Sequence, residues 1–167
     1  LGPVASAALH REDPVPARRR MGEVDGPLAT FVRLFTLGQP VDAAEVDELL
    51  PSLTAAGLDM LGSYVKPGVT TQRLDDLAFQ FAMDNSAYPA TLFYRGYSHS
   101  LCTSVNHVVC HGIPGDKVLS DGDILNIDVT VIVDGWYGDS SRMYVAGKPS
   151  VKSRRLIQVT HDSLMKG

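Results

Sequence analysis

The sequence predicts an α+β fold in which two helices precede an antiparallel β-hairpin. Between residues 41 and 86, two segments repeat apolar residues at helical spacing, and further along two β-branched runs meet at an Asp-Gly pair. Of the 167 residues, 44% are hydrophobic and 20% are charged, a balance that is ordinary for a globular protein. The length fits one domain with a real core.

The first 38 residues are rich in Pro, Ala, Gly and Arg and show weak periodicity. We therefore expect a flexible N-terminal extension over residues 1–38 and a folded domain over residues 39–167. Arg18, Arg19 and Arg20 form a small basic cluster that could contact ribosomal RNA, although three charges are most often a solvated surface. The net charge of −4 argues against a nucleic-acid-binding domain, and no apolar run approaches the roughly 20 residues of a membrane span.

Two helices are expected first. The earlier one, over residues 41–65, carries small or apolar residues at helical spacing, namely Leu50, Leu53, Gly57 and Leu61. Lys66-Pro67-Gly68 ends it. Thr70 or Thr71 can cap the second helix, which ends at Asn85-Ser86. Its apolar stripe consists of Leu74, Leu77, Ala78 and Phe81. Both stripes are expected to face the core.

Strands are expected in the second part of the domain. Short apolar runs at Thr91–Tyr94 and Ser104–Cys110 predict two of them. Residues Ile124–Val133 and Trp136–Tyr144 predict a hairpin, because Asp134-Gly135 suits a two-residue type I′ turn.

Two carboxylates lie inside the hairpin. With a two-residue loop, Val133 faces Trp136 and Thr130 faces Asp139, which puts Asp128 on the same face as Asp139 and diagonal to it. The diagonal separation is about 7–8 Å between backbones. Two carboxylates at that distance can share a hard or borderline cation and would otherwise repel each other. The pair therefore predicts a metal site.

Other interpretations of the two aspartates remain open. A single Asp in a strand is usually an edge residue that faces water. A same-face pair among apolar neighbours is costly to bury unless something offsets the charges. A three-residue loop would place Asp139 opposite Val129, on the face away from Asp128, and the shared site would not form.

Four segments together resemble the type 1 methionine aminopeptidases of the pita-bread metallopeptidase family. They are, in chain order, YRGYSHS, CTSVNHVVCHGIPGD, NIDVTV and DGWYGDSSRM. The resemblance runs from about Val41 to the last residue and is densest from Tyr94 to Tyr144. It implies a curved antiparallel sheet backed by helices, which is the first half of a pita-bread fold. It also implies a cytoplasmic enzyme that removes initiator methionine from nascent proteins, and two cysteines without CxxC spacing suit a reducing compartment.

The resemblance implies a centre of two divalent metal ions, with cobalt, manganese, iron and zinc all compatible. Asp139 would bridge the metals and Asp128 would bind one of them. The family's remaining ligands, one His and two Glu including the general base, belong to the second half of its fold. Residues 39–167 are therefore expected to be an amino-terminal portion, inactive alone unless a partner chain completes the site.

The resemblance also assigns a catalytic histidine and a substrate pocket. His111 follows an apparent strand and precedes Gly112-Ile113-Pro114, but the sequence alone does not prefer it over His99, His107 or His161. In the family the matching His hydrogen-bonds the substrate amide near the scissile bond and helps stabilise the tetrahedral intermediate.

Tyr94, Tyr97 and Cys102 match the wall of the family's methionine pocket, and His111 also binds substrate. Without the resemblance, their segment is equally a loop packed over the sheet. Aromatic edges and a soft sulfur would complement a long, polarizable side chain. The segment departs from the family pattern, because Arg95, Ser98 and His99 stand where many members have His, Pro and Lys. Tyr137 stands where a His is common, so the charge at the pocket rim and the surroundings of the metal site would differ.

Two further functional classes remain. A non-catalytic binding module, or a subunit, would contact nascent chains, the ribosome or a completing partner chain. A proline-specific peptidase of the same fold fits less well, because the CHGIP and NIDVTV segments match the methionine-specific branch more closely.

Overall fold

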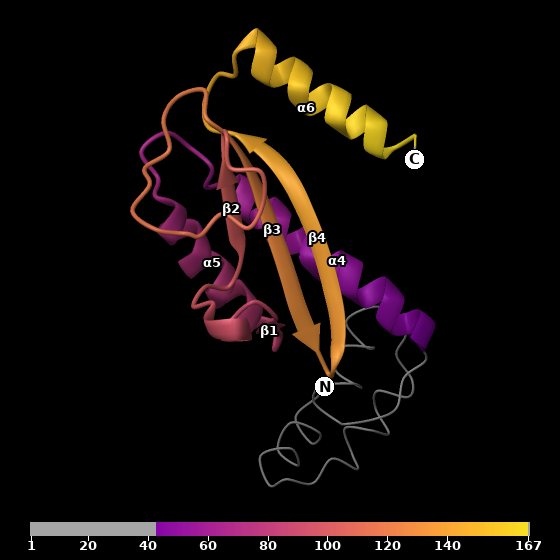
Figure 1. Ribbon diagram of the computed structural model, residues 1–167. Helices are drawn as coiled ribbons and strands as arrows, with labels where there is room; N and C mark the ends of the chain where they lie inside the picture. The colour runs from indigo at the N-terminus through magenta and orange to yellow at the C-terminus, as the bar shows by residue number, and fades with distance from the viewer. Residues whose placement is uncertain (1–42, 167) are drawn as a thin grey trace, which may run out of the picture.

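The computed structural model describes residues 43–166, with side chains from residue 52 onward (Figure 1). The expected extension over residues 1–38, with Arg18, Arg19 and Arg20, lies outside this part. The elements in order are α4 (Ala43–Gly62), α5 (Thr71–Asp84), β1 (Tyr88–Pro89), the 3₁₀ turn η2 (Tyr94–Gly96), β2 (Cys102–Val105), β3 (Ile124–Val133), β4 (Trp136–Val145) and α6 (Val151–Leu164). The α+β prediction is confirmed.

β3 is the central strand of an antiparallel sheet. β4 pairs with β3 along its whole length on one edge. On the other edge, β2 pairs with residues 125–128 of β3, and β1 pairs with residues 131–132. Figure 1 shows the two long strands bending across the molecule with α4 behind them. The expected curved sheet backed by helices is therefore present.

The hairpin between β3 and β4 has the predicted two-residue loop. Val133 pairs with Trp136, and Thr130 pairs with Asp139. Asp134 and Gly135 both have positive φ, 48° and 85°, as a type I′ turn requires. The three-residue alternative is excluded, and Asp128 and Asp139 share a face of the sheet.

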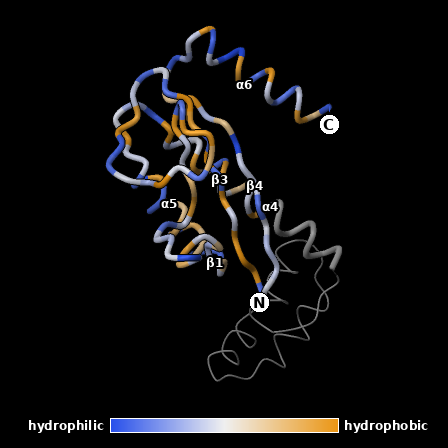
Figure 2. The backbone as a smooth tube through the Cα atoms, in the orientation of Figure 1, coloured by the Kyte–Doolittle hydropathy of each residue, from blue (hydrophilic) through white to orange (hydrophobic). Residues whose placement is uncertain are grey.

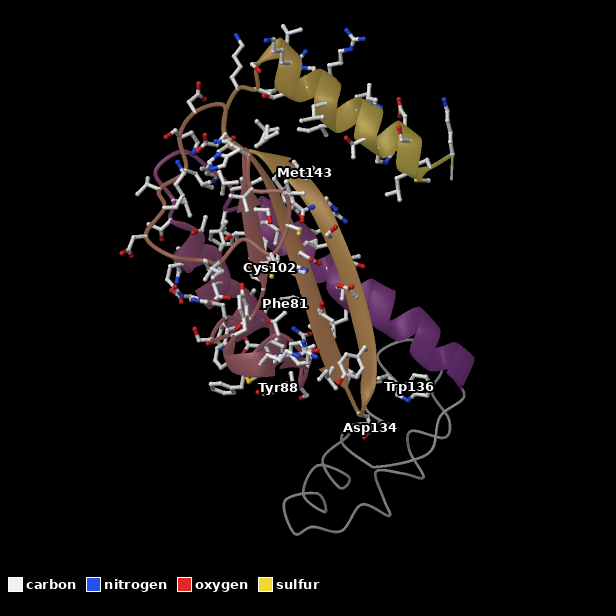
Figure 3. All side chains as sticks on the ribbon, viewed as in Figure 1. Phe81, Tyr88, Cys102, Asp134, Trp136 and Met143 are labelled. Carbon is white, nitrogen blue, oxygen red and sulfur yellow. The ribbon has the colours of Figure 1, made fainter. Side chains whose placement is uncertain are left out.

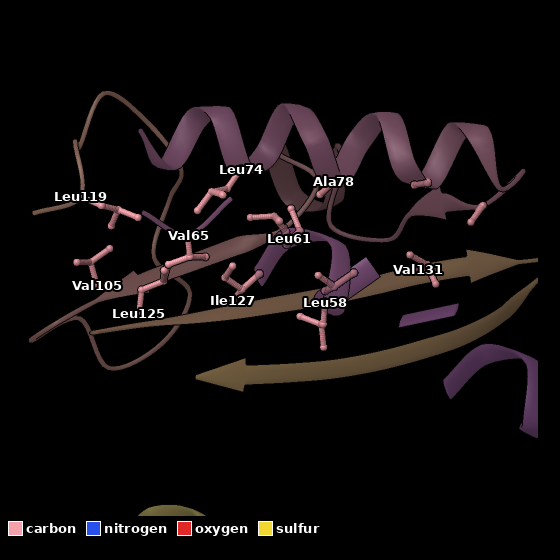
Figure 4. Packing of buried hydrophobic residues seen from close by; sticks show 14 of the residues in the cluster. Leu58, Leu61, Val65, Leu74, Ala78, Val105, Leu119, Leu125, Ile127 and Val131 are labelled. Carbon is pink, nitrogen blue, oxygen red and sulfur yellow. The ribbon is translucent and has the colours of Figure 1, made fainter. Parts of the chain in front are cut away.

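The hydrophobic core lies between one face of the sheet and the two helices (Figure 4). On β3 every second side chain is buried, namely Leu125, Ile127, Val129, Val131 and Val133. These side chains pack in one cluster with Leu58 and Leu61 of α4 and with Leu74 and Ala78 of α5. Since strand side chains alternate between faces, the intervening residues of β3, which include Asp128, point away from this core.

Polar contacts join α4 to the edge strand β4. The Tyr144 hydroxyl donates a hydrogen bond of 2.6 Å to the Leu58 carbonyl oxygen, and Arg142 forms an ion pair with Asp59. Gly62 lies against the Tyr144 ring so closely that an added Cβ would come within 2.9 Å of a ring carbon. The edge strand is therefore held in place by contacts on its helix-facing side.

The second helix matches its prediction. Thr70 is the N-cap, with its hydroxyl accepting a hydrogen bond of 3.1 Å from the Arg73 backbone N–H, and Asn85 is the C-cap. The first helix ends at Gly62, followed by a turn, and it is three residues shorter than predicted at that end.

The two short strand predictions were largely wrong. Thr91–Tyr94 forms a turn that leads into η2, and the strand in this region is β1. The predicted run Ser104–Cys110 overlaps β2 only at its first two residues. Asn106 ends β2, because it takes a positive φ of 54° and its side chain bonds the backbone N–H of Ile124 and the Asp123 carboxylate. Tertiary side-chain bonding overrode the apolar pattern.

α6 stands clear of the sheet in Figure 1, and none of its described residues is buried. Figure 2 shows hydrophobic and hydrophilic residues mixed along it. Its exposed apolar side chains include Val151, Leu156, Val159 and Leu164. Within residues 43–166, no helix is long and apolar enough to cross a membrane.

Candidate metal and substrate site

The hairpin places two carboxylates on the face of the sheet that points away from the helices. Asp139 on β4 lies directly opposite Thr130 on β3, and the Thr130 hydroxyl donates a hydrogen bond of 2.8 Å to Asp139 Oδ1. Asp128 lies two residues before Thr130 on β3 and is partly buried. The register that was predicted from the turn therefore brings the two carboxylates onto one surface.

The surroundings of Asp128 shift its ionisation. Burial raises the pKa of Asp128 above its ordinary value, and the negative charge of Asp139 and a side-chain hydrogen bond with it raise this pKa further. His111 acts in the opposite direction, so it also lies within electrostatic range. A proton or a cation would relieve the repulsion between the pair.

The chemistry of this pair fits a divalent metal ion in part. Carboxylate oxygens suit hard and borderline cations, and the negative charges of Asp128 and Asp139 lie close enough together for a cation between them to offset both. Among residues 43–166, however, no group of three or more His, Cys, Asp or Glu side chains is arranged to hold a metal. Among the described residues, the two aspartates are therefore fewer ligands than a protein metal site ordinarily uses.

A cavity of about 550 Å³ opens beside the carboxylates. It is lined by Thr91, Tyr94, Arg95, Gly96, Tyr97, Cys102 and His111. The four residues predicted to bind substrate, Tyr94, Tyr97, Cys102 and His111, thus line one cavity. Cys102 of β2 pairs directly with Asp128 of β3, which makes the cavity wall continuous with the carboxylate pair. Figure 3 shows Cys102 over the middle of the sheet, far from Asp134 and Trp136 at the hairpin tip.

His111 is held against β2 by the residue that follows it. Gly112 donates its N–H to Ser104 Oγ at 3.1 Å and accepts a hydrogen bond of 2.8 Å from Thr103 N. A Cβ at Gly112 would lie 2.0 Å from the Thr103 carbonyl oxygen, so glycine is required for this close approach. His111 itself has a positive φ of 52°.

Tyr97 and Cys102 form a neutral part of the cavity wall. The Tyr97 hydroxyl donates a hydrogen bond of 2.9 Å to the Leu101 carbonyl oxygen and lies 3.5 Å from Cys102 Sγ. Burial raises the pKa of both groups, and for Tyr97 the hydrogen bond to Cys102 adds to this rise. At neutral pH the wall therefore presents an uncharged aromatic ring and an uncharged thiol, a surface that suits an apolar, polarizable side chain.

Three lining residues were not predicted to bind substrate, namely Thr91, Arg95 and Gly96. The Arg95 guanidinium lies 5.3 Å from the centre of the Tyr94 ring and puts a cation at the rim. In the sequence, the position of Arg95 inside the YRGYSHS segment was the signal that it lies near the cavity. Of the other histidines considered, His99 bonds Asp75, and His107 and His161 are exposed. Among the described residues, His111 is thus the histidine that lines this cavity.

Comparison with known proteins gave clear relatives. The model of metallopeptidase family M24 matches residues 51–167, and the model of a domain of unknown function (DUF7059) matches residues 1–73. The methionine aminopeptidase of Rickettsia prowazekii (strain Madrid E) is 59% identical over 115 residues, which cover 69% of this chain and 44% of that protein.

One further relative and one solved structure are similar to this chain. The methionine aminopeptidase of Escherichia coli (strain K12) is 51% identical over 114 residues, covering 67% of this chain and 43% of that protein. The crystal structure of the Rickettsia prowazekii methionine aminopeptidase superposes with a TM-score of 0.71 at 52% identity, covering 76% of this chain and 52% of that one. This chain spans less than half of the length of these curated relatives.

Proposed function

This chain belongs to metallopeptidase family M24, and on that basis we propose that it forms the amino-terminal part of a methionine aminopeptidase. The observation that carries the proposal is the meeting of two features on one face of the sheet. Cys102, in the wall of an apolar cavity, pairs across the strands with Asp128, which itself lies beside Asp139. An apolar side chain held in this cavity would have its backbone near the carboxylate pair.

Asp128 and Asp139 would hold divalent metal in this proposal. We propose two ions, of cobalt, manganese, iron or zinc, with Asp139 shared between them. Bound divalent metal lowers the pKa of water and polarises a substrate carbonyl. The Thr130 hydroxyl orients Asp139 through its hydrogen bond to Oδ1. The remaining ligands would come from sequence beyond the described residues or from a partner chain.

His111 and the cavity wall would bind the substrate. We propose that His111 donates a hydrogen bond to the substrate amide and stabilises negative charge as the tetrahedral intermediate forms. Tyr94, Tyr97 and Cys102 would enclose the methionine side chain, because their neutral, polarizable groups complement a thioether. The substrates would be peptides and nascent proteins with N-terminal methionine.

A cytoplasmic location forms part of this proposal, because the two cysteines are free and free thiols suit a reducing compartment. A ribosome contact through Arg18, Arg19 and Arg20 also remains a proposal.

The test is release of methionine from a Met-Ala-Ser peptide by the purified native polypeptide, including any sequence beyond residue 167, with added Mn²⁺ or Co²⁺. Turnover should depend on metal, and Asp139→Asn should abolish it. His111→Ala should lower the rate by about a hundredfold while metal binding persists, as loss of an oxyanion-type donor does. Metal-dependent cleavage of Xaa-Pro peptides with no cleavage of Met-Ala-Ser would assign the proline-specific branch instead.

A non-catalytic binding module is the second candidate, because residues 43–166 hold no group of three metal ligands. In that case the native polypeptide would bind methionine peptides in the cavity without cleaving them. The 167-residue chain assayed alone should show little activity above background, since neither the metal geometry nor a general base is assembled. Robust turnover by this chain that is lost in Asp128→Asn would contradict our view of what completes the site.

A further inference from the structure

A buried carboxylate on α5 reaches the loop that forms the cavity wall. Asp75 is only 6% exposed. Its Oδ1 accepts hydrogen bonds from the backbone N–H groups of Ser100 at 2.7 Å and Leu101 at 3.2 Å. Its Oδ2 accepts one from His99 Nδ1 at 3.0 Å, and Gln72 Nε2 lies 3.4 Å away. Three successive residues of the loop, 99 to 101, therefore donate hydrogen bonds to this one carboxylate.

The residues that Asp75 holds are the ones that position Tyr97. The His99 imidazole packs against the Tyr97 ring edge-on, with centroids 5.7 Å apart and planes at 70°. The Leu101 carbonyl oxygen accepts the hydrogen bond of the Tyr97 hydroxyl. Leu101 also directly precedes Cys102. Asp75 thus acts on two cavity residues, Tyr97 and Cys102, although it does not line the cavity itself.

Asp75 lies on a helix that is packed into the core, whereas the loop that it holds is irregular. Leu74 and Ala78, which flank Asp75 on α5, belong to the core cluster. Tyr97 at the start of the loop is bonded to the preceding turn, since its N–H donates to the Tyr94 carbonyl oxygen at 2.9 Å and its carbonyl oxygen accepts from the Phe93 N–H at 2.6 Å. Residues 98–101 belong to no helix or strand. The Thr91 hydroxyl, in the cavity wall, also donates a hydrogen bond of 2.8 Å to the His99 carbonyl oxygen.

We propose that Asp75 is a positioning residue for the substrate cavity, fixing the Tyr97 and Cys102 wall and thereby its preference for a long unbranched side chain. The positioning itself follows from the hydrogen bonds, and its effect on substrate choice rests on the proposed peptidase function. Small displacements of a positioning wall are enough to change how a bound side chain fits. Asp75 touches neither substrate nor metal and acts through the loop.

The first test measures how fast the Cys102 thiol in the cavity wall is alkylated, and it does not use peptidase activity. Alkylation of Cys102 by iodoacetamide is followed by peptide mass spectrometry in the native polypeptide, with exposed Cys110 as an internal reference. Asp75→Ala should speed Cys102 alkylation by about tenfold, because a buried thiol reacts faster when the wall that covers it is loosened. Asp75→Asn should have a smaller effect, since its amide oxygen still accepts from the loop.

Two matched variants control this measurement. Asp76→Asn removes the same charge from the next residue of α5, which is exposed and bonds only Gln72 among the described contacts, and it should leave the rate unchanged. Leu74→Ala weakens the core cluster that Leu74 shares with Leu101, without removing a hydrogen bond to the loop. If Leu74→Ala speeds Cys102 alkylation as much as Asp75→Ala does, general loosening explains the effect and the positioning role is overturned.

The second test uses the proposed activity. Asp75→Ala should raise KM for Met-Ala-Ser by about tenfold and lower the ratio of kcat/KM for methionine over isoleucine at the first residue, with a smaller change in kcat. A loss of folded protein alone would lower kcat for both peptides equally and leave their ratio unchanged. If Asp75→Ala does not fold, Asp75→Asn and His99→Gln provide the same comparison.

The outcomes separate the two proposals. An unchanged Cys102 rate overturns the positioning role of Asp75, whatever the peptidase assay shows. A faster Cys102 rate with an unchanged methionine preference overturns its effect on substrate choice. A wild type that releases no methionine contradicts the proposed function, and the alkylation measurement then still decides whether Asp75 positions the wall.

Discussion

Asp128→Asn should stabilise the metal-free protein and remove most of the stabilisation that metal provides. The sign follows from the raised pKa of Asp128 in the folded state. Between the ordinary pKa and the raised one, the folded protein binds more protons than the unfolded chain, so stability falls as pH rises through that window. Above that window the Asp128 carboxylate therefore costs stability, and an uncharged amide of the same size relieves that cost.

The magnitude can be estimated from the hairpin geometry. The two carboxylates are close enough for a side-chain hydrogen bond, and two unit charges about 4 Å apart repel by roughly 1 kcal/mol at a dielectric constant of about 80 and by roughly 4 kcal/mol at about 20. Asp139 is exposed while Asp128 is partly buried, which favours the lower part of this range. A gain of about 1 kcal/mol would raise Tm by about 2–4 °C in a protein of this size. The gain should shrink at high salt.

Thermal unfolding in EDTA and in excess Mn²⁺ measures both effects. At a metal concentration about 100-fold above Kd, the wild type should gain roughly 2.7 kcal/mol. Asp128→Asn should gain little, so the order of stability should reverse between the two conditions. Asp116→Asn, at an exposed loop position away from the pair, removes the same charge. It should change little in the stability in EDTA or in the stability gained from Mn²⁺.

Two results would contradict this reasoning. A variant less stable than the wild type in EDTA would show that the carboxylates do not repel each other in the fold. An equal gain from Mn²⁺ in the wild type and in Asp128→Asn would show that metal binds elsewhere.

Three further changes test other parts of the structure. Gly112→Ala should lower both stability and methionine release, because its Cβ would collide with the Thr103 carbonyl oxygen; unchanged values in melting and activity assays would refute the close approach. Thr70→Ala should cost about 1 kcal/mol in denaturant unfolding through loss of the α5 cap. Hydrogen bonding from Asn106 lowers the pKa of Asp123. The wild type should therefore be more stable than Asp123→Asn above pH of about 4, and this advantage should disappear as pH falls further. Urea titrations at several pH values measure it.

The sequence by itself determined the hairpin and the shared face of its two carboxylates. The signals there are local, because the Asp134-Gly135 pair selects the turn type and the turn sets the pairing of Thr130 with Asp139. The buried face of β3 follows from the period of two. The second helix and its Thr70 cap were also predictable, because the apolar stripe and the capping residue are local signals.

Only the tertiary structure decided where the irregular segments lie. Thr91–Tyr94 has an apolar, strand-like pattern, yet it forms a turn beside the cavity. The choice of His111 among the histidines became visible in the structure when the loop closed against β2 through Gly112. Asp75 contacts residues 24 to 26 positions away, and no local pattern marks it, because its three hydrogen bonds exist only after α5 and the loop have packed together.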